Sequence, residues 1–204
     1  GEYRRQRQMC IRDSYTSIGV SADEFIKSLM DHQEKLHFAL GRGRKRASIG
    51  VHDLAKLAPP FTVKAVSGDT KFTPLAATEP MSIKEIMAEH PKGIEYAHLL
   101  SEFDRYPIIL DAENNVLSFP PIINGDHTTV TKETKDFFID VTGWDIRACE
   151  SSLMLIALQL QEYGGIIETV EVTNCFGETN VYPNGSAVEH KLTIAAIQGL
   201  LGGK

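Results

Sequence analysis

The most informative part of the chain is LSFPPIINGDHTTVTKETKDFFIDVTG, residues Leu117–Gly143. A double proline interrupts an apolar run near its start, and a polar, threonine-rich segment follows. At its end, polar Asp140 and Thr142 alternate with apolar Ile139 and Val141. This period of two predicts a strand with the carboxylate and the hydroxyl on one face and the apolar pair on the other. A carboxylate and a hydroxyl side by side, just before a glycine, favour a small polar pocket over a core.

The composition is that of an ordinary globular protein. The chain has 204 residues, of which 42% are hydrophobic and 24% charged, enough for one sizeable core and part of a second. The longest uninterrupted apolar run, Leu153–Leu158, is too short to span a bilayer, and the N-terminus has no apolar secretory region. The three cysteines show no C-x-x-C spacing, so they indicate neither a disulfide framework nor a zinc site. These features favour a reducing, cytoplasmic setting.

The first fourteen residues differ from the rest of the chain. Arg4–Ser14 has no hydrophobic period, carries a charge opposite to that of the remainder, and is similar to the translation of a sequencing-library adapter. We therefore expect residues 1–14 to be a non-native or disordered segment that lies outside the fold.

Capping boxes and periodicity predict the helices. Ser21–Glu24 and Ser82–Glu85 are both capping boxes, in which a serine and a glutamate satisfy backbone donors at a helix start. The second of these helices must end before Pro91. Ile146–Tyr163 is the clearest helix, and its apolar stripe consists of Cys149, Leu153, Ile156 and Leu160.

Short apolar or alternating runs predict the strands, which are Ala47–Val51, Phe61–Val66, Pro107–Leu110, Val116–Phe119 and Ile166–Val172. The third and fourth of these form a hairpin, because the loop between them contains asparagines that tolerate left-handed backbone. Helices and strands are mixed without a regular β-α-β alternation. We predict an α+β fold with a mixed, largely antiparallel sheet flanked by helices.

The predicted organisation has one main domain, residues 15–173. Residues 174–187 are rich in turn formers and are predicted to be a linker. Residues 188–204 are predicted to be the opening strand and helix of a second unit.

The main basic cluster consists of Arg42, Arg44, Lys45 and Arg46. It is either a solvated turn after a helix or a phosphate contact, and the sequence leaves both open. The formal net charge of −6 argues against a protein that grips nucleic acid by bulk electrostatics, but not against local contact with RNA. These four residues are therefore candidates for RNA contact.

Two of the seven histidines stand beside an aspartate, in His52-Asp53 and in Asp126-His127. Neither pair has the second ligand at helical spacing that a zinc site needs, and we expect both in loops. We interpret them as surface or hydrogen-bonding residues and predict no metal site.

A series of spaced motifs resembles one family, in the same order along the chain. The motifs are Gly43–Leu54, Pro59–Thr62, His90–Gly93, Tyr106–Pro107, Ser118–Gly125 and Phe138–Gly143. They resemble the archaeal and eukaryotic-cytosolic type of phenylalanyl-tRNA synthetase beta subunit, over its B3/B4 region. The tail from Tyr182 is similar to the start of the B5 domain, although Pro183-Asn184-Gly185 stands where the family often has Pro-Asp-Leu.

The resemblance implies an enzyme, phenylalanine–tRNA ligase, which joins phenylalanine to its tRNA with ATP and magnesium. The family's aminoacylation site lies on the alpha subunit, so no cofactor is expected in this region. The implied partners are the alpha subunit, in a heterotetramer, and tRNA, in the cytoplasm and without a membrane. In the family, the B3/B4 region carries editing, the hydrolysis of tyrosine wrongly attached to the tRNA of phenylalanine.

Matched motif by motif, the resemblance implies an editing pocket formed by Ser118, Asp140 and Thr142. Asp140 is the expected partner of the tyrosine phenol, because an ionised carboxylate accepts a strong hydrogen bond. Thr142 and Ser118 would orient the water or the terminal ribose. The resemblance also implies an apolar wall formed by Ile109 and Leu110, so the expected substrate-binding residues are Ile109, Leu110 and Asn124.

The sequence also allows other roles for these residues. Asp140 could cap the following helix, and the two hydroxyls could be ordinary strand side chains. The whole region could be a non-catalytic structural or RNA-binding module of the same synthetase. Editing predicts an open pocket lined by Ser118, Asp140 and Thr142, whereas a filled core there would favour the structural module.

Overall fold

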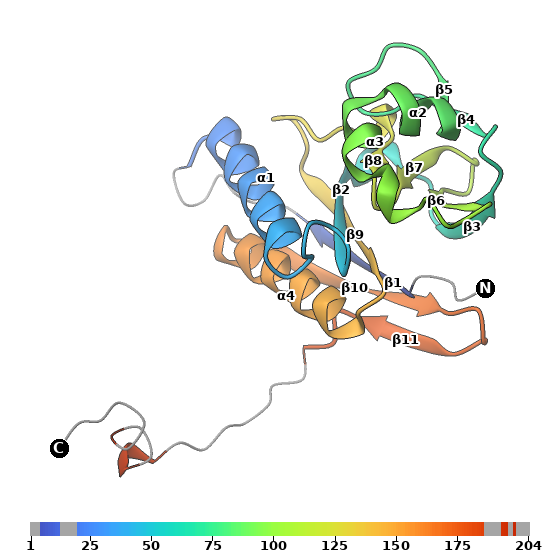
Figure 1. Cartoon of the computed structure of the whole chain (residues 1–204). Helices are drawn as coiled ribbons and strands as arrows, with labels where there is room; N and C mark the ends of the chain where they lie inside the picture. Colours follow the sequence, from blue (N-terminus) through green and yellow to red (C-terminus); the bar gives the residue numbers. More distant parts are fainter. Residues whose placement is uncertain (1–4, 13–19, 186–192, 196–197, 199–204) are drawn as a thin grey trace.

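A computed structural model describes residues 5–12, 20–185, 193–195 and 198 (Figure 1). The larger of its sheets has five strands in the order β11-β10-β1-β9-β2, and every neighbouring pair is antiparallel. These strands are β1 (Arg5–Arg12), β2 (Ala47–Asp53), β9 (Asp136–Gly143), β10 (Ile166–Thr173) and β11 (Thr179–Tyr182).

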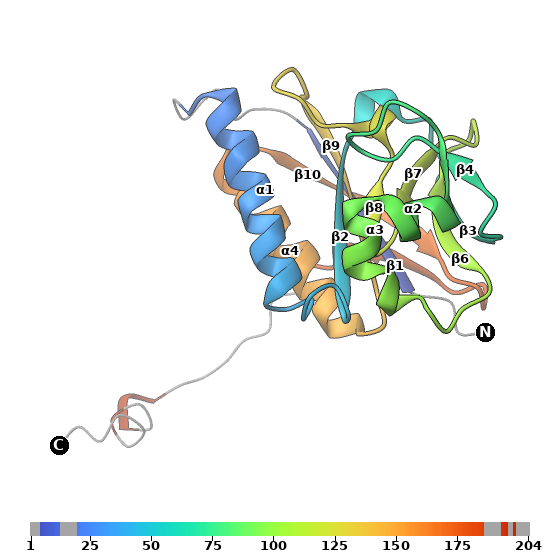
Figure 2. The ribbon, with the colours of Figure 1, turned by 45° about the horizontal axis from the view of Figure 1, so that its top comes forward.

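Two long helices cover one face of the larger sheet. α1 (Ala22–Phe38) and α4 (Ile146–Glu162) lie side by side against it (Figures 1 and 2). The apolar side chains that alternate along β9 point into this layer and form one cluster with both helices. The stripe predicted on the last helix is buried in the same cluster and consists of Cys149, Leu153, Ile156 and Leu160.

A second, four-stranded sheet lies on the opposite side of β2 and β9 from the helix pair (Figure 2). Its order is β3-β6-β7-β8, again antiparallel, with β3 (Thr62–Val66), β6 (Tyr106–Leu110), β7 (Val116–Phe119) and β8 (Ile123–Asn124). Shorter elements complete this half: β4 (Lys71–Phe72), β5 (Met81–Ser82), α2 (Ile83–Glu89), α3 (Pro91–Tyr96) and the 3-10 turns η2 (Leu54–Lys56), η3 (Ala97–Leu99) and η4 (Asp126–Thr128). The predicted α+β class with a largely antiparallel sheet is confirmed.

The predicted helix starts and the predicted hairpin are present in the structure. Both predicted capping boxes are present: the Ser21 hydroxyl accepts from the Glu24 amide at the start of α1, and Ser82 does the same for Glu85 at the start of α2. The predicted hairpin joins β6 to β7, with Asn114 in the left-handed region at φ 65°. The loop therefore reverses at a residue type that tolerates this conformation.

Two segments differ from the expectation. Residues 5–12, expected to lie outside the fold, form β1 between β9 and β10. The expected linker begins as a hairpin, in which β11 pairs with β10 and the Asn174 side chain accepts from the amides of Phe176 and Glu178. The turn-forming residues there mark a tight reversal of the chain. The predicted second unit, residues 188–204, lies almost wholly outside the described residues.

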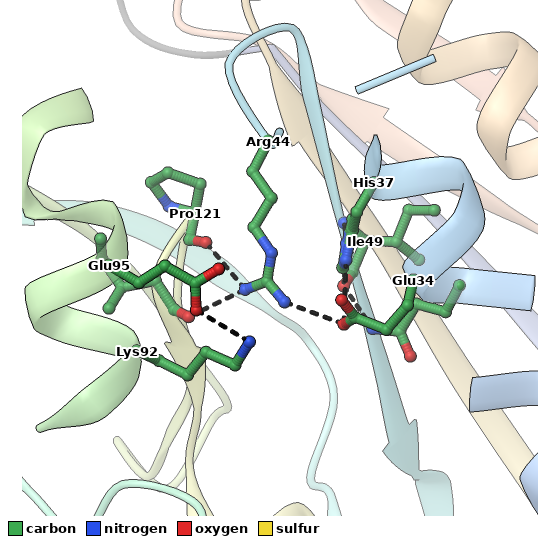
Figure 3. A network of polar contacts seen from close by, with 9 residues as sticks. Glu34, His37, Arg44, Ile49, Lys92, Glu95 and Pro121 are labelled. Carbon is green, nitrogen blue, oxygen red and sulfur yellow. Dashed lines mark hydrogen bonds and ion pairs between the residues drawn. The ribbon is translucent and has the colours of Figure 1, made fainter. Parts of the chain in front are cut away.

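A buried arginine connects the two halves of the molecule (Figure 3). Arg44 donates from Nη1 to the carbonyl oxygens of Pro121 and Ile122, at 3.2 and 3.0 Å, and from Nη2 to Glu34 Oε1 at 3.0 Å. Its guanidinium carbon also lies 4.5 Å from the centre of the Tyr96 ring. These contacts connect α1 and α3 to the turn between β7 and β8.

The Glu34 carboxylate receives a second donor from its own helix. The Ile49 amide donates to His37 Nε2 at 2.8 Å, and His37 Nδ1 lies 3.3 Å from Glu34 Oε1. The hydrogen bond from His37, followed by the positive charge of Arg44, lowers the pKa of Glu34 to about 2, against the opposing effect of partial burial. Burial lowers the pKa of His37, so this imidazole is neutral in the folded protein at neutral pH.

We predict that Glu34 contributes to the loss of stability in acid. Because the pKa of Glu34 falls from 4.5 unfolded to about 2 folded, the ionised group stabilises the fold above pH 4.5, and this contribution is lost as pH falls toward 2. When the pH is lowered from about 6 to about 3, wild type should lose about 1 kcal/mol more free energy of unfolding than the Glu34→Gln variant. The effect is small because the Glu34 side chain lies at the surface, where solvent screens its charge. Urea titrations at the two pH values measure it.

The matched control is Glu89→Gln, which alters an exposed carboxylate of α2. This control should keep the wild-type pH dependence. Equal acid sensitivity in wild type and Glu34→Gln would contradict the assignment.

Candidate functional site

A row of polar side chains lies along the face of β2 and β9 that points away from the long helices. Asp140 is directly opposite Gly50, and Thr142 is directly opposite Ser48. The apolar residues between them in sequence, Ile139 and Val141, belong to the helix-side core. The two-residue alternation predicted for this strand therefore places the carboxylate and the hydroxyl on one face.

The second sheet contributes another row from the facing side. Ile109 of β6 is paired with Ser118 of β7, which is paired with Asn124 of β8, so these three share one face. The Ser118 hydroxyl donates to Asn124 Oδ1 at 3.3 Å, and Asn124 Nδ2 donates across to the Val51 carbonyl of β2 at 3.4 Å. The predicted candidates Ser118 and Asn124 therefore lie against the strand pair that carries Asp140.

The predicted apolar wall is divided between two faces. Ile109 is buried in a cluster with Leu117 and Phe138, and the Phe138 ring centre lies 4.2 Å from that of Phe61. Leu110 packs instead into the core under α2 and α3. Neighbouring residues of a strand point to opposite faces, so the expectation that both line one wall holds only for Ile109.

His52 is the residue that sequence reasoning misplaced. We expected it in a loop, but it lies in β2 and is 0% exposed. Its Nε2 lies 2.8 Å from Asp140 Oδ2, and its Nδ1 lies 2.8 Å from Thr128 Oγ1. The interpretation as a hydrogen-bonding residue is right, and its predicted place at the surface is wrong. Asp140 is held by His52, and the cap of α4 is Asp145.

Both ring nitrogens of His52 have a polar partner. The Thr128 hydroxyl lies 2.8 Å from Nδ1, and it also lies 3.1 Å from the Gly125 carbonyl oxygen, to which it can donate. Which ring nitrogen carries a proton depends on the tautomer of the imidazole. The Asp140 carboxyl group is therefore buried against a hydrogen-bonding partner, which limits the free-energy cost of burying it.

The site depends on a glycine directly opposite the carboxylate. A Cβ atom at position 50 would lie 2.1 Å from Asp140 Oδ2 and 2.6 Å from His52 Nε2. Both distances are far below van der Waals contact. Gly50 therefore leaves the space in which the histidine and the aspartate meet.

Thr142 is a buried hydroxyl whose hydrogen-bonding capacity is not used. Within the described part of the chain, its Oγ1 has no hydrogen-bond partner. A hydroxyl buried without a partner costs about 1–3 kcal/mol. Such a group beside a carboxylate is a reason to expect a polar ligand.

The row is buried, which differs from the open pocket that we expected. Ser118, Asp140 and Thr142 are 3%, 1% and 2% exposed. A cavity of about 1050 Å³ lies elsewhere, beside the loop of the basic cluster, and none of these three residues lines it.

The four candidates for RNA contact are not equivalent. Arg42, Lys45 and Arg46 are exposed and line that cavity. Arg44 is buried against carbonyl groups and Glu34, so its assignment as an RNA contact is wrong. Arg42 and Arg44 both have a positive φ, of 48° and 64°, so the hydrogen bonds of Arg44, which composition does not reveal, are what distinguish it.

The described ranges contain neither a candidate metal site nor a candidate membrane span. In these ranges no group of three or more His, Cys, Asp or Glu side chains could hold a metal ion. None of the helices there has the length and apolar character that a membrane span requires.

The antiparallel fold and its facing polar rows define a class of domain. The chain belongs to the B3/4 domain family, because the model of that family matches residues 17–159. This confirms the resemblance drawn from the ordered motifs.

The relatives are subunits of one enzyme. The chain is 52% identical over 177 residues to the phenylalanine–tRNA ligase beta subunit of Methanosarcina acetivorans, covering 87% of this chain and 32% of that protein. It is 49% identical over 169 residues to the same subunit of Methanocaldococcus jannaschii, covering 81% and 30%. The chain thus spans about a third of the length of the curated relatives that it matches.

A solved structure has the same fold. It is the crystal structure of an N-terminal fragment of the phenylalanyl-tRNA synthetase beta subunit from Pyrococcus horikoshii, with a TM-score of 0.88 and 33% sequence identity. The similarity covers 97% of this chain and 56% of that fragment.

We predict that Gly50→Ala disrupts the site. The added methyl group cannot be accommodated without moving the Asp140 or His52 side chain, so the variant should lose about 1–3 kcal/mol of unfolding free energy. Urea unfolding measures this loss. The control is Gly185→Ala, because a Cβ at position 185 meets no atom within 4 Å. Equal stability of the two variants would contradict the packing described for Gly50.

Proposed function

We propose that this chain is part of a phenylalanine–tRNA ligase beta subunit, and that its polar row hydrolyses tyrosine wrongly attached to the tRNA. The proposed partners are the alpha subunit and tRNA, in the cytoplasm. ATP and magnesium would serve the whole enzyme at its aminoacylation site, and none of the steps below involves them.

The observation that carries the proposal is the buried Thr142 hydroxyl without a partner, beside Asp140 on the same strand face. Tyrosine differs from phenylalanine by one hydroxyl. A phenol can donate to the Asp140 oxygen that does not contact His52, and it can accept from Thr142. Phenylalanine would leave both groups unpaired at a cost of about 1–3 kcal/mol for each group.

The surrounding side chains suit the rest of a tyrosyl ester. Ile109 and Phe138 supply apolar surface for the ring. Ser118 and Asn124 lie in the facing row, where they can orient a water molecule at the ester carbonyl. Water then adds to this carbonyl, the ester bond to the ribose breaks, and tyrosine and uncharged tRNA are released.

A proofreading site of this kind supplies discrimination that a first site lacks. An apolar pocket for phenylalanine rejects an added hydroxyl by only about a hundredfold. A site that hydrogen-bonds the hydroxyl rejects the analogue that lacks it much more strongly, because its buried polar groups would lose their partners. Asp140 and Thr142 have this second kind of chemistry.

A second candidate function is a non-catalytic structural module of the same synthetase. The burial of all three proposed catalytic side chains favours it, because closed strand hydroxyls can serve packing alone. In this case the His52–Asp140 contact would only fix the register between β2 and β9.

The two candidates predict different results for Thr142→Val in the complete enzyme. If the row edits, this isosteric loss of the hydroxyl should slow hydrolysis of tyrosyl-tRNA about 10- to 100-fold. Thr142→Val should also raise the free energy of unfolding, because it removes an unsatisfied buried polar group. The matched variant Thr142→Ser keeps the hydroxyl and should retain most of the activity. Release of labelled tyrosine from mischarged tRNA measures the rate.

If wild type, Thr142→Val and Thr142→Ser all hydrolyse tyrosyl-tRNA at the same rate, the pocket assignment fails. If none exceeds the uncatalysed rate, the structural module is the better description.

A further inference from the structure

A surface groove, separate from the polar row, is built from three segments that are distant in sequence. Its cavity of about 1050 Å³ is lined by the loop after α1, the connection from η3 to β6, and the start of α4. Two glycines allow close approach of the backbone, Gly143 between the loop after α1 and the start of α4, and Gly41 within that loop. A Cβ at Gly143 would lie 2.1 Å from the Arg46 carbonyl oxygen, and one at Gly41 would lie 2.5 Å from that of Ala47. The Arg46 carbonyl accepts from the amides of Trp144 and Asp145, at 3.2 and 3.3 Å.

Two aromatic rings lie flat against each other in this groove. Phe103 and Trp144 stack with their ring centres 5.9 Å apart and their planes at 16°. They are 39% and 45% exposed, although both rings are large and apolar. An exposed pair of parallel rings offers a surface on which a planar base can stack.

The groove is positive although the chain is negative. Among the residues that the structure describes, those that line it include four cationic side chains, Arg42, Lys45, Arg46 and Arg147, and two carboxylates, Glu102 and Asp145. These formal charges give a net +2, whereas the whole chain carries −6. The Asp145 carboxylate is already engaged, since it pairs with Arg46 and accepts from the amides of Arg147 and Ala148.

We propose that this groove binds single-stranded RNA, with a base stacked at Trp144 and the phosphates near Arg42, Lys45 and Arg147. Flat exposed rings within a positive channel are the combination that recognises unpaired nucleotides without reading their sequence. A protein partner of opposite charge would satisfy the cations, but it would not require parallel rings.

The groove adjoins the polar row along β9. Trp144 follows Thr142 by two positions, which is about 7 Å along an extended strand. If one nucleotide is stacked at Trp144, the next residue of the RNA strand would therefore lie near Thr142. This orientation rests on the proposed function, whereas binding of RNA to the groove does not.

The chain contains one tryptophan, so its fluorescence reports on the groove alone. Titration of the 204-residue chain with an RNA hexamer of adenylate should quench the emission of Trp144 in a saturable manner. The binding constant should weaken with salt by about 0.7 logarithmic units per tenfold salt for each phosphate contact. A blunt RNA duplex of the same charge should quench far less, because its bases are not free to stack.

Variants separate stacking from charge, with fluorescence anisotropy of labelled RNA as the measurement. Trp144→Ala should raise Kd about 5- to 100-fold. Lys45→Glu and Arg147→Glu should each raise Kd and flatten the salt dependence. The matched control is Lys64→Glu, which makes the same charge change at an exposed position of β3 outside the groove.

The proposal is overturned if the hexamer leaves the Trp144 emission unchanged, or if Lys64→Glu weakens binding as much as Lys45→Glu and Arg147→Glu. Because the hexamer carries no amino acid, these results do not depend on whether the polar row hydrolyses an ester. Binding to the groove with no deacylation would keep this proposal and reject the editing function.

Discussion

The contact between His52 and Asp140 is the interaction on which the arrangement of the polar row depends. It joins adjacent strands, and the same imidazole reaches Thr128 on the segment that follows β8. Because both groups are buried, the contact tolerates neither a lost partner nor a shift in register. Gly50 must stand opposite the carboxylate, and Asn124 then reaches the neighbouring carbonyl of Val51.

Strand β9 serves three purposes because its side chains alternate. Its apolar side chains anchor the sheet to α1 and α4. Its other face supplies the carboxylate and the hydroxyl that we propose to recognise a phenol. Its end at Gly143 lets the basic loop approach, so that Trp144 faces a groove with net positive charge. A site for an amino acid and a site for nucleotides would therefore share one strand, as an aminoacyl-tRNA substrate requires.

Much of this fold was predictable because its signals are local. Capping boxes, the apolar stripe of α4 and the asparagine in the hairpin each act over a few residues. The shared face of Asp140 and Thr142 was predictable too, since it follows from a period of two. The separation of Ile109 from Leu110 follows from the same period, and we neglected it in treating them as one wall.

The rest depends on long-range contacts that a sequence pattern does not encode. His52 ends a short apolar run and resembles a loop residue until its partner, 88 positions away, is known. Arg44 resembles its exposed neighbours in composition, and its hydrogen bonds to the carbonyls of Pro121 and Ile122 distinguish it from them. The polar segment β1 has no hydrophobic period, and it forms a strand through its pairing with β9 on one side and β10 on the other. The groove unites residues from three loops, and no single motif contains it.

The proposed editing function requires that the polar row receives a tyrosine side chain, and a structure with a bound substrate mimic would test this. The mimic would be adenosine with tyrosine attached to its ribose by a non-hydrolysable amide. We predict that the phenol oxygen lies within about 3.2 Å of both the Asp140 carboxylate and the Thr142 hydroxyl, with the second sheet displaced to admit the ring. A mimic held only in the surface groove, with the row still closed and the Thr142 hydroxyl still without a partner, would contradict it.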